Sequence, residues 1–109
     1  MLADRRHINR ERVRALLPPL QPVDRANLIR DYVDPSPLGY GPDKAVVRDH
    51  NVSVWTIIAD LVASDGNIEL VREEFNLSVE AVYAAILYYL TIPELIEARI
   101  ILSEAPFQA

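Results

Sequence analysis

Residues 53–90, SVWTIIADLVASDGNIELVREEFNLSVEAVYAAILYYL, decide the fold class of this chain. The first apolar side chains follow the i, i+3, i+4, i+7, i+8 spacing of an amphipathic helix, namely Val54, Ile57, Ile58, Leu61 and Val62. Gly66 suits the left-handed end of that helix, and Asn67 is placed to cap a second helix. Ser78 is placed to cap a third helix, from 79 to 90, after a three-residue turn. The pattern predicts a helix-turn-helix-like, or homeodomain-like, bundle of three helices.

The third predicted helix lacks the side chains that read DNA. Residues 79–90 include no Lys, Arg, Asn or Gln, which are the residues that pair most readily with base edges in the major groove. The helix is instead apolar and rich in tyrosine. We therefore expect a fold of the DNA-binding type that is used mainly to bind protein.

The remaining elements predict a mainly α-helical chain with a minor β element. Asn9 can cap a helix over residues 10–17, which Pro18 and Pro19 end, and residues 24–33 form a second amphipathic helix. Residues 34–44 read as a loop, residues 45–48 as a short strand, and residues 49–51 as a turn. Thr91 and Glu94 have the spacing of a capping box for a last helix, residues 93–104. We divide the chain into an N-terminal helical arm with a basic start, residues 1–33, and a helix-turn-helix-like domain with a C-terminal helix, residues 34–109.

The last two helices carry more apolar residues than one monomer face needs. Val82, Ile86, Tyr89 and Leu90 suffice for the core face of residues 79–90, and a helix that is hydrophobic all round is normally buried all round. In so small a chain we expect a second chain to cover the excess, as a homodimer or a protein partner. The alternative is that the last two helices bury each other within one monomer. The predicted interface residues are Tyr83, Leu87, Tyr88, Ile96 and Ile100.

Charge is distributed unevenly along the chain, whose net charge is −5. Residues 1–54 carry nine basic and seven acidic side chains, and residues 55–109 carry two basic and nine acidic ones. An acidic C-terminal half repels phosphate, so any nucleic-acid contact should come from the N-terminal part. The candidates are the arginines at 5, 6, 10, 12 and 14, namely Arg5, Arg6, Arg10, Arg12 and Arg14. The same arginines could instead pair with acidic groups of a dimer mate or another protein.

No motif in the sequence indicates catalysis, a metal, a cofactor or a small-molecule substrate. His7 and His50 are isolated, and GYGPDK lacks the GK[ST] ending of a phosphate-binding loop. The chain has no cysteine, which excludes disulfides and favours a reducing cytoplasm. No apolar run approaches the roughly 18 residues that cross a bilayer. We therefore expect a cytoplasmic, non-enzymatic, non-membrane protein.

The chain resembles a small bacterial family known as domain of unknown function 433, from about residue 34 to residue 103. The resemblance rests on DP…GYGPDKAVVRDHNVSVW, a variant of the family's DP…GGKPVIxGTRIxV, and on the helical segment that follows. Where the family has Gly-Thr-Arg, this chain has Asp49, His50 and Asn51. The family resemblance implies a short β element followed by a trihelical, homeodomain-like bundle.

The same resemblance implies a function. Family members are generally regarded as antitoxins, often paired with a small toxin resembling PIN-type nucleases. Our leading hypothesis is thus an antitoxin-like regulator that binds and neutralises a protein partner through apolar helical surface. The alternative is a DNA-binding transcriptional regulator that uses the helix-turn-helix-like core and the N-terminal arginines.

Overall fold

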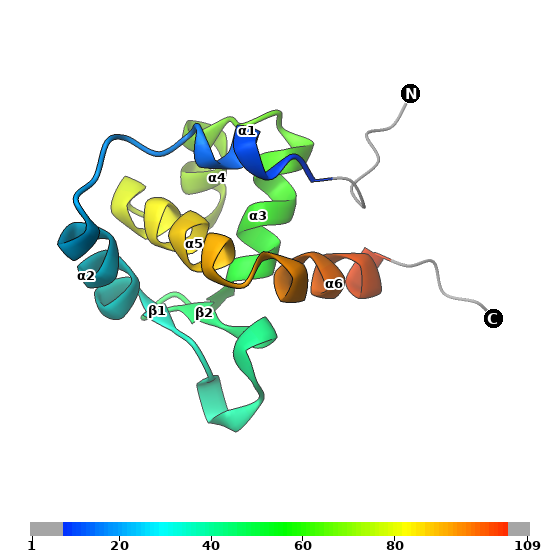
Figure 1. The fold of residues 1–109 in the computed structure, drawn as a ribbon. Coiled ribbons are helices and arrows are strands. Elements are labelled where there is room, and N and C mark those ends of the chain that lie inside the picture. The colour runs from blue at the N-terminus through cyan, green and yellow to red at the C-terminus, as the bar shows by residue number, and fades with distance from the viewer. Residues whose placement is uncertain (1–7, 105–109) are drawn as a thin grey trace.

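A computed structural model of the chain describes residues 8–104 and is mainly helical, with a small three-stranded sheet (Figure 1). Two short 3-10 turns lie in the loop that precedes the second strand. In chain order the elements are α1 (Arg10–Arg14), α2 (Pro22–Tyr32), β1 (Val33–Asp34), η1 (Pro37–Gly39), η2 (Pro42–Lys44), β2 (Val46–Val47), β3 (Val52–Ser53), α3 (Val54–Ala63), α4 (Ile68–Phe75), α5 (Val79–Thr91) and α6 (Pro93–Glu104).

Three predicted helix limits in residues 53–90 are confirmed by their caps, whereas Ser53, which was expected to cap α3, makes no side-chain hydrogen bond at its start. The Asn67 side chain accepts a hydrogen bond from the Leu70 amide at 3.0 Å, and Ser78 Oγ accepts one from the Ala81 amide at 3.1 Å. Gly66 has a φ of 83°, and its amide donates to the Leu61 carbonyl at 2.7 Å. These bonds satisfy the free backbone groups that every helix end exposes, so the local sequence alone sets the three boundaries.

Three local predictions were wrong. The first helix ends at Arg14 rather than at residue 17, and Val33 lies in a strand rather than in the second helix. The Thr91–Glu94 capping box does not form, because Thr91 is the last residue of α5 and its hydroxyl donates to the Tyr88 carbonyl at 2.6 Å. In each case a backbone or side-chain group forms a hydrogen bond with a group that the spacing of residues in the sequence does not identify.

The small sheet joins the N-terminal part of the chain to the rest. β2 pairs antiparallel with both β1 and β3, with Val33 opposite Val47 and Val46 opposite Ser53. The predicted turn at residues 49–51 is confirmed, and Asp49 and Asn51 adopt positive φ values of 68° and 55°. The sheet therefore ties α2 to the body of the fold, and residues 8–33 share its hydrophobic core.

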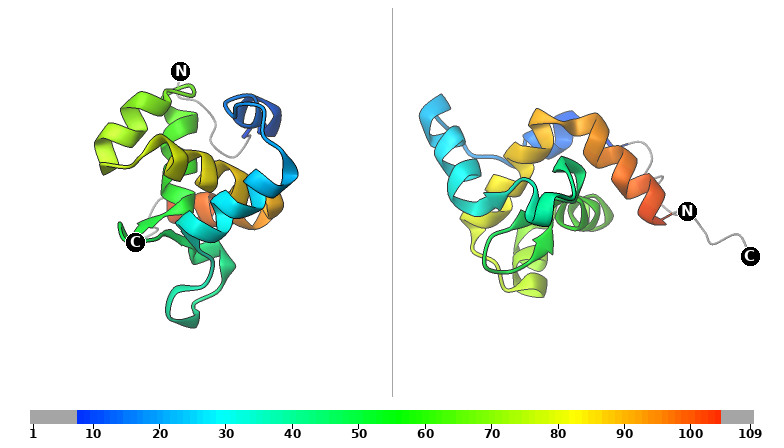
Figure 2. Two further views of the ribbon diagram at one scale, coloured as in Figure 1. Left: turned by 90° about the vertical axis from the view of Figure 1, so that its left-hand side faces the viewer. Right: turned by 90° about the horizontal axis from the view of Figure 1, so that it is seen from below.

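α5 lies at the centre of the molecule, with helices around it (Figures 1 and 2). Its most extensive contacts are with α2 and α3, and α1, α4, α6 and β1 also touch it. Eight of its residues are buried, namely Ala81, Val82, Ala84, Ala85, Ile86, Leu87, Tyr88 and Tyr89. The burial of α5 requires no second chain, because α2 and α3 of the same chain cover it. The predicted homodimer stays a prediction.

No single helix in residues 8–104 is long and apolar enough to cross a membrane. α5 and α6 reach the required length and composition only together, and the chain bends by 104° between them.

Candidate protein-binding surface

The outward side of α6 carries large apolar side chains that no other element in residues 8–104 covers. Leu95, Ile101 and Leu102 are 41%, 38% and 66% exposed, and Ala98 lies exposed between them. Ile96 and Ile100, on the inward side, are fully buried. We call Leu95, Ala98, Ile101 and Leu102 the outer face of α6. A helix with apolar residues on both sides fits a position between a core and a partner.

Two polar contacts attach α6 and the end of α5 to the loop before β2. Arg99 Nε donates to Asp43 Oδ2 at 3.1 Å, and the Tyr88 hydroxyl donates to the Pro42 carbonyl at 2.9 Å. Burial of Tyr88 raises the pKa of its hydroxyl above the ordinary value, so it remains a donor. The outer face of α6 is thereby presented on a helix that is held at its inner side.

A three-residue polar cluster connects α1, α5 and α6. Arg10 donates from Nε and Nη2 to the two carboxylate oxygens of Glu97, at 2.8 and 2.7 Å, and the Tyr89 hydroxyl donates to Glu97 at 2.5 Å. The hydrogen bonds from Arg10 lower the pKa of Glu97, while burial raises that of Tyr89. This bidentate geometry is the strongest that an arginine–carboxylate pair adopts.

The lowered pKa of Glu97 predicts a loss of stability in acid. Its folded pKa lies below the ordinary glutamate value of about 4.3, so its stabilising effect is complete above that value and disappears as pH falls through the folded pKa. We expect E97Q to be less stable than the wild type at pH 7, with the difference shrinking toward pH 3. Urea unfolding of both proteins across this range measures the difference, and a gap that stays constant with pH would contradict the assignment.

The structure places four of the five predicted interface residues inside the chain. Leu87 and Tyr88 are 5% and 6% exposed, and Ile96 and Ile100 are fully buried, so only Tyr83 keeps partial exposure. In the folded chain these four side chains therefore offer little or no surface to a partner. The residues of the outer face of α6 are among the apolar residues that exceed a single face of this helix. Periodicity cannot show which side of a helix with apolar residues all round is exposed.

The described arginines of the N-terminal cluster pair with acidic groups of the same chain. Arg10 contacts Glu97, Arg12 contacts Asp65 at 2.6 Å, and Arg14 contacts Glu11. Arg5, Arg6 and His7 lie outside the described residues. These pairs form within one chain and not with a dimer mate or another protein, which stays a prediction, and each such pair reduces the charge offered to phosphate.

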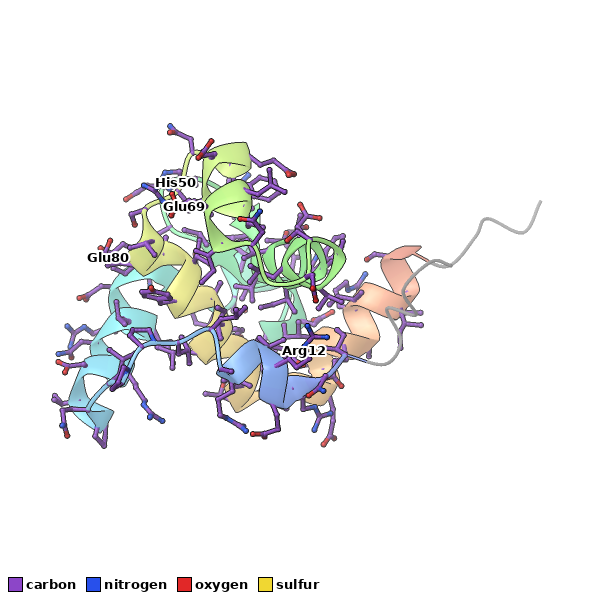
Figure 3. The ribbon with its side chains drawn as sticks, turned by 90° about the horizontal axis from the view of Figure 1, so that it is seen from above. Arg12, His50, Glu69 and Glu80 are labelled. Carbon is purple, nitrogen blue, oxygen red and sulfur yellow. The ribbon has the colours of Figure 1, made fainter. Side chains whose placement is uncertain are left out.

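Acidic side chains dominate the exposed surface of α4 and the first turn of α5. Glu69, Glu73, Glu74 and Glu80 are exposed, and Arg72, the one basic residue of α4, pairs with Glu69 at 3.0 Å. Glu69, Glu80 and the turn residue His50 point away from the body on one side of the molecule, and Arg12 lies on another (Figure 3). This surface would repel a phosphate backbone.

Metal-binding groups do not gather in residues 8–104: no three His, Cys, Asp or Glu side chains there are arranged to hold an ion. His50, on the exposed turn, lies with Nδ1 3.1 Å from the Arg48 carbonyl.

The comparison with known families covers the part of the chain from η2 to α5. Residues 43–89 match the family described as Protein of unknown function (DUF433). The suspected family is confirmed over this range. The DUF433 match excludes α1, α2, β1 and α6, and so leaves out the outer face of α6. No curated protein and no solved structure matches the chain.

Proposed function

We propose that this protein is a non-enzymatic, antitoxin-like regulator that binds and neutralises a protein partner through the outer face of α6. The observation that carries the proposal is the exposure of Leu95, Ile101 and Leu102 on a helix whose inner side is anchored in the core. Burying such a side chain contributes roughly 1.5–3 kcal/mol, so three of them supply a specific contact. The class of partner, a small PIN-like nuclease toxin, follows from the DUF433 resemblance.

The charge of the chain supports a nuclease as the partner. A nuclease presents basic surface to its nucleic-acid substrate, and the exposed glutamates of α4 and α5 complement such a surface. An acidic protein that docks by an apolar helix can therefore also compete with the substrate electrostatically. In this proposal α3, α4 and α5 form a helix-turn-helix-like scaffold that supports α6.

The alternative, a DNA-binding regulator, has less support. A recognition helix needs one face free to enter the major groove, and in α5 the side chains that would form such a face pack against α2 and α3. Glu80 and the exposed glutamates of α4 add repulsion at the same end. Arg5 and Arg6 remain candidates for DNA contact in this alternative.

Replacing Leu102 by Asp should remove partner binding without unfolding the protein. Leu102 is 66% exposed, so the charge stays in water in the free protein but would be desolvated in a complex. We expect at least about a tenfold loss of captured partner, equivalent to 1.4 kcal/mol. Tagged protein is recovered from its native cells, washed at high salt and analysed by mass spectrometry.

The matched control is Val23→Asp on α2. Val23 is 63% exposed, and V23D introduces the same charge at similar exposure on a different element. Recovery of a small nuclease-like protein with the wild type and V23D, but not with L102D, would support the proposal. Equal recovery with all three proteins would place the interface elsewhere, and recovery of DNA without a protein partner would favour the alternative.

A further inference from the structure

The segment formed by residues 8–17 contains α1. Apart from its peptide connection to α2, it contacts the rest of the described chain through side chains alone. Its described backbone hydrogen bonds all close within the segment, as in Val13 to Asn9 and Leu17 to Arg14. Its polar links to other elements are the Arg10–Glu97 and Arg12–Asp65 pairs. No strand pairing or shared helix would have to be rebuilt if the segment moved.

The surface of the protein on which this segment packs, which we call its seat, is apolar and fits the segment closely. Val13 is 4% exposed and belongs to the hydrophobic core, and α1 lies against α5. Leu16 packs against Gly66 so closely that a Cβ added there would lie 3.0 Å from Leu16 Cδ2. The seat therefore fits a short helix that directs a valine and a leucine inward and an arginine toward Glu97.

The connection between α1 and α2 can act as a hinge. After the turn at residues 15–17, residues 18–21 lead from α1, at the top of Figure 1, along its left-hand side to α2. They include Pro18 and Pro19, which favour an extended chain. The four residues 18–21, which follow this segment and precede α2, span at most about 14 Å when extended, and a change in their path would let α1 reach a neighbouring molecule.

We propose that α1 is exchangeable and that two copies of this chain dimerise by each placing its α1 in the seat of the other. A second copy offers the same Glu97, Asp65 and Gly66 to the same α1, so every contact of the closed monomer is reproduced between chains. The closed monomer and the exchanged dimer differ mainly in the path of residues 18–21. Their proportion is set by concentration.

Charge reversal distinguishes exchange from any other form of association. R10E places Glu opposite Glu97 within its own chain, and E97R places Arg opposite Arg10, so each variant repels its own α1. In a mixture each α1 finds an opposite charge in the other variant. We expect a 1:1 heterodimer at least about tenfold more abundant than either homodimer, by native mass spectrometry. The double variant R10E/E97R, complementary within one chain, is the control and should behave as the wild type.

Shortening the hinge tests the proposal without altering the seat. Deleting residues 18–20 removes three of the four residues between this segment and α2, and we expect the shortened connection to keep α1 from its own seat while a neighbour's seat stays within reach. We expect sedimentation to show self-association at least about tenfold tighter than in the wild type. The proposal is overturned if the shortened protein stays monomeric, or if the mixed charge variants remain two folded monomers.

Discussion

Replacing Ile96 by Asp should unfold the protein, whereas replacing its neighbour Leu95 by Asp should not. Ile96 is fully buried on the inner side of α6, where an aspartate would have neither water nor a partner. Removing the buried isoleucine alone costs about 2–5 kcal/mol, and burying a carboxylate adds several more. The sum reaches the total stability of a small domain, about 5–15 kcal/mol.

Leu95 provides the matched control because it is 41% exposed on the same turn of the same helix. An aspartate there remains hydrated, and we expect a change in stability within about 0.5 kcal/mol. Circular dichroism and urea unfolding measure both variants. If I96D unfolds cooperatively with wild-type stability, α6 does not pack as described and Ile96 again becomes a candidate for partner contact.

The helices of residues 53–90 could be located from the sequence because their limits depend on local chemistry. Asn67 and Ser78 each accept a backbone hydrogen bond at a helix start, and Gly66 adopts the positive φ that ends α3. Residue type and spacing determine these features over three or four positions. Prediction was therefore good for the elements that local bonds define.

The side of a helix that is buried could not be predicted where burial depends on packing between distant segments. α5 was expected to need a second chain, but α2, which ends more than forty residues earlier, covers it. Tyr88 likewise is buried because its hydroxyl reaches the Pro42 carbonyl. Periodicity reports how much apolar surface a helix has and not which segment covers it. For the same reason the sequence could not show that the outer face of α6 is exposed while Ile96 and Ile100 are buried.

Replacing Tyr89 by Ala should remove most of the free energy of unfolding that comes from the contacts of α5 with α6 and α1. Tyr89 is the largest fully buried side chain in the described core, and its hydroxyl donates to Glu97, which also receives Arg10. We expect Y89A to lose about 3–5 kcal/mol, the usual cost of removing a buried aromatic ring. Y89F keeps the ring and loses one hydrogen bond, so we expect about 0.5–1.5 kcal/mol.

The two variants together separate packing from the polar cluster. In Y89F the carboxylate of Glu97 still accepts both hydrogen bonds from Arg10. The loss of unfolding free energy in Y89F should therefore be smaller than in the double variant E97Q/Y89F. Guanidinium unfolding of the wild type, Y89F and Y89A measures the three free energies. Equal losses in Y89F and Y89A would mean that the hydroxyl, and not the ring, holds the helices together, against the burial of the whole side chain.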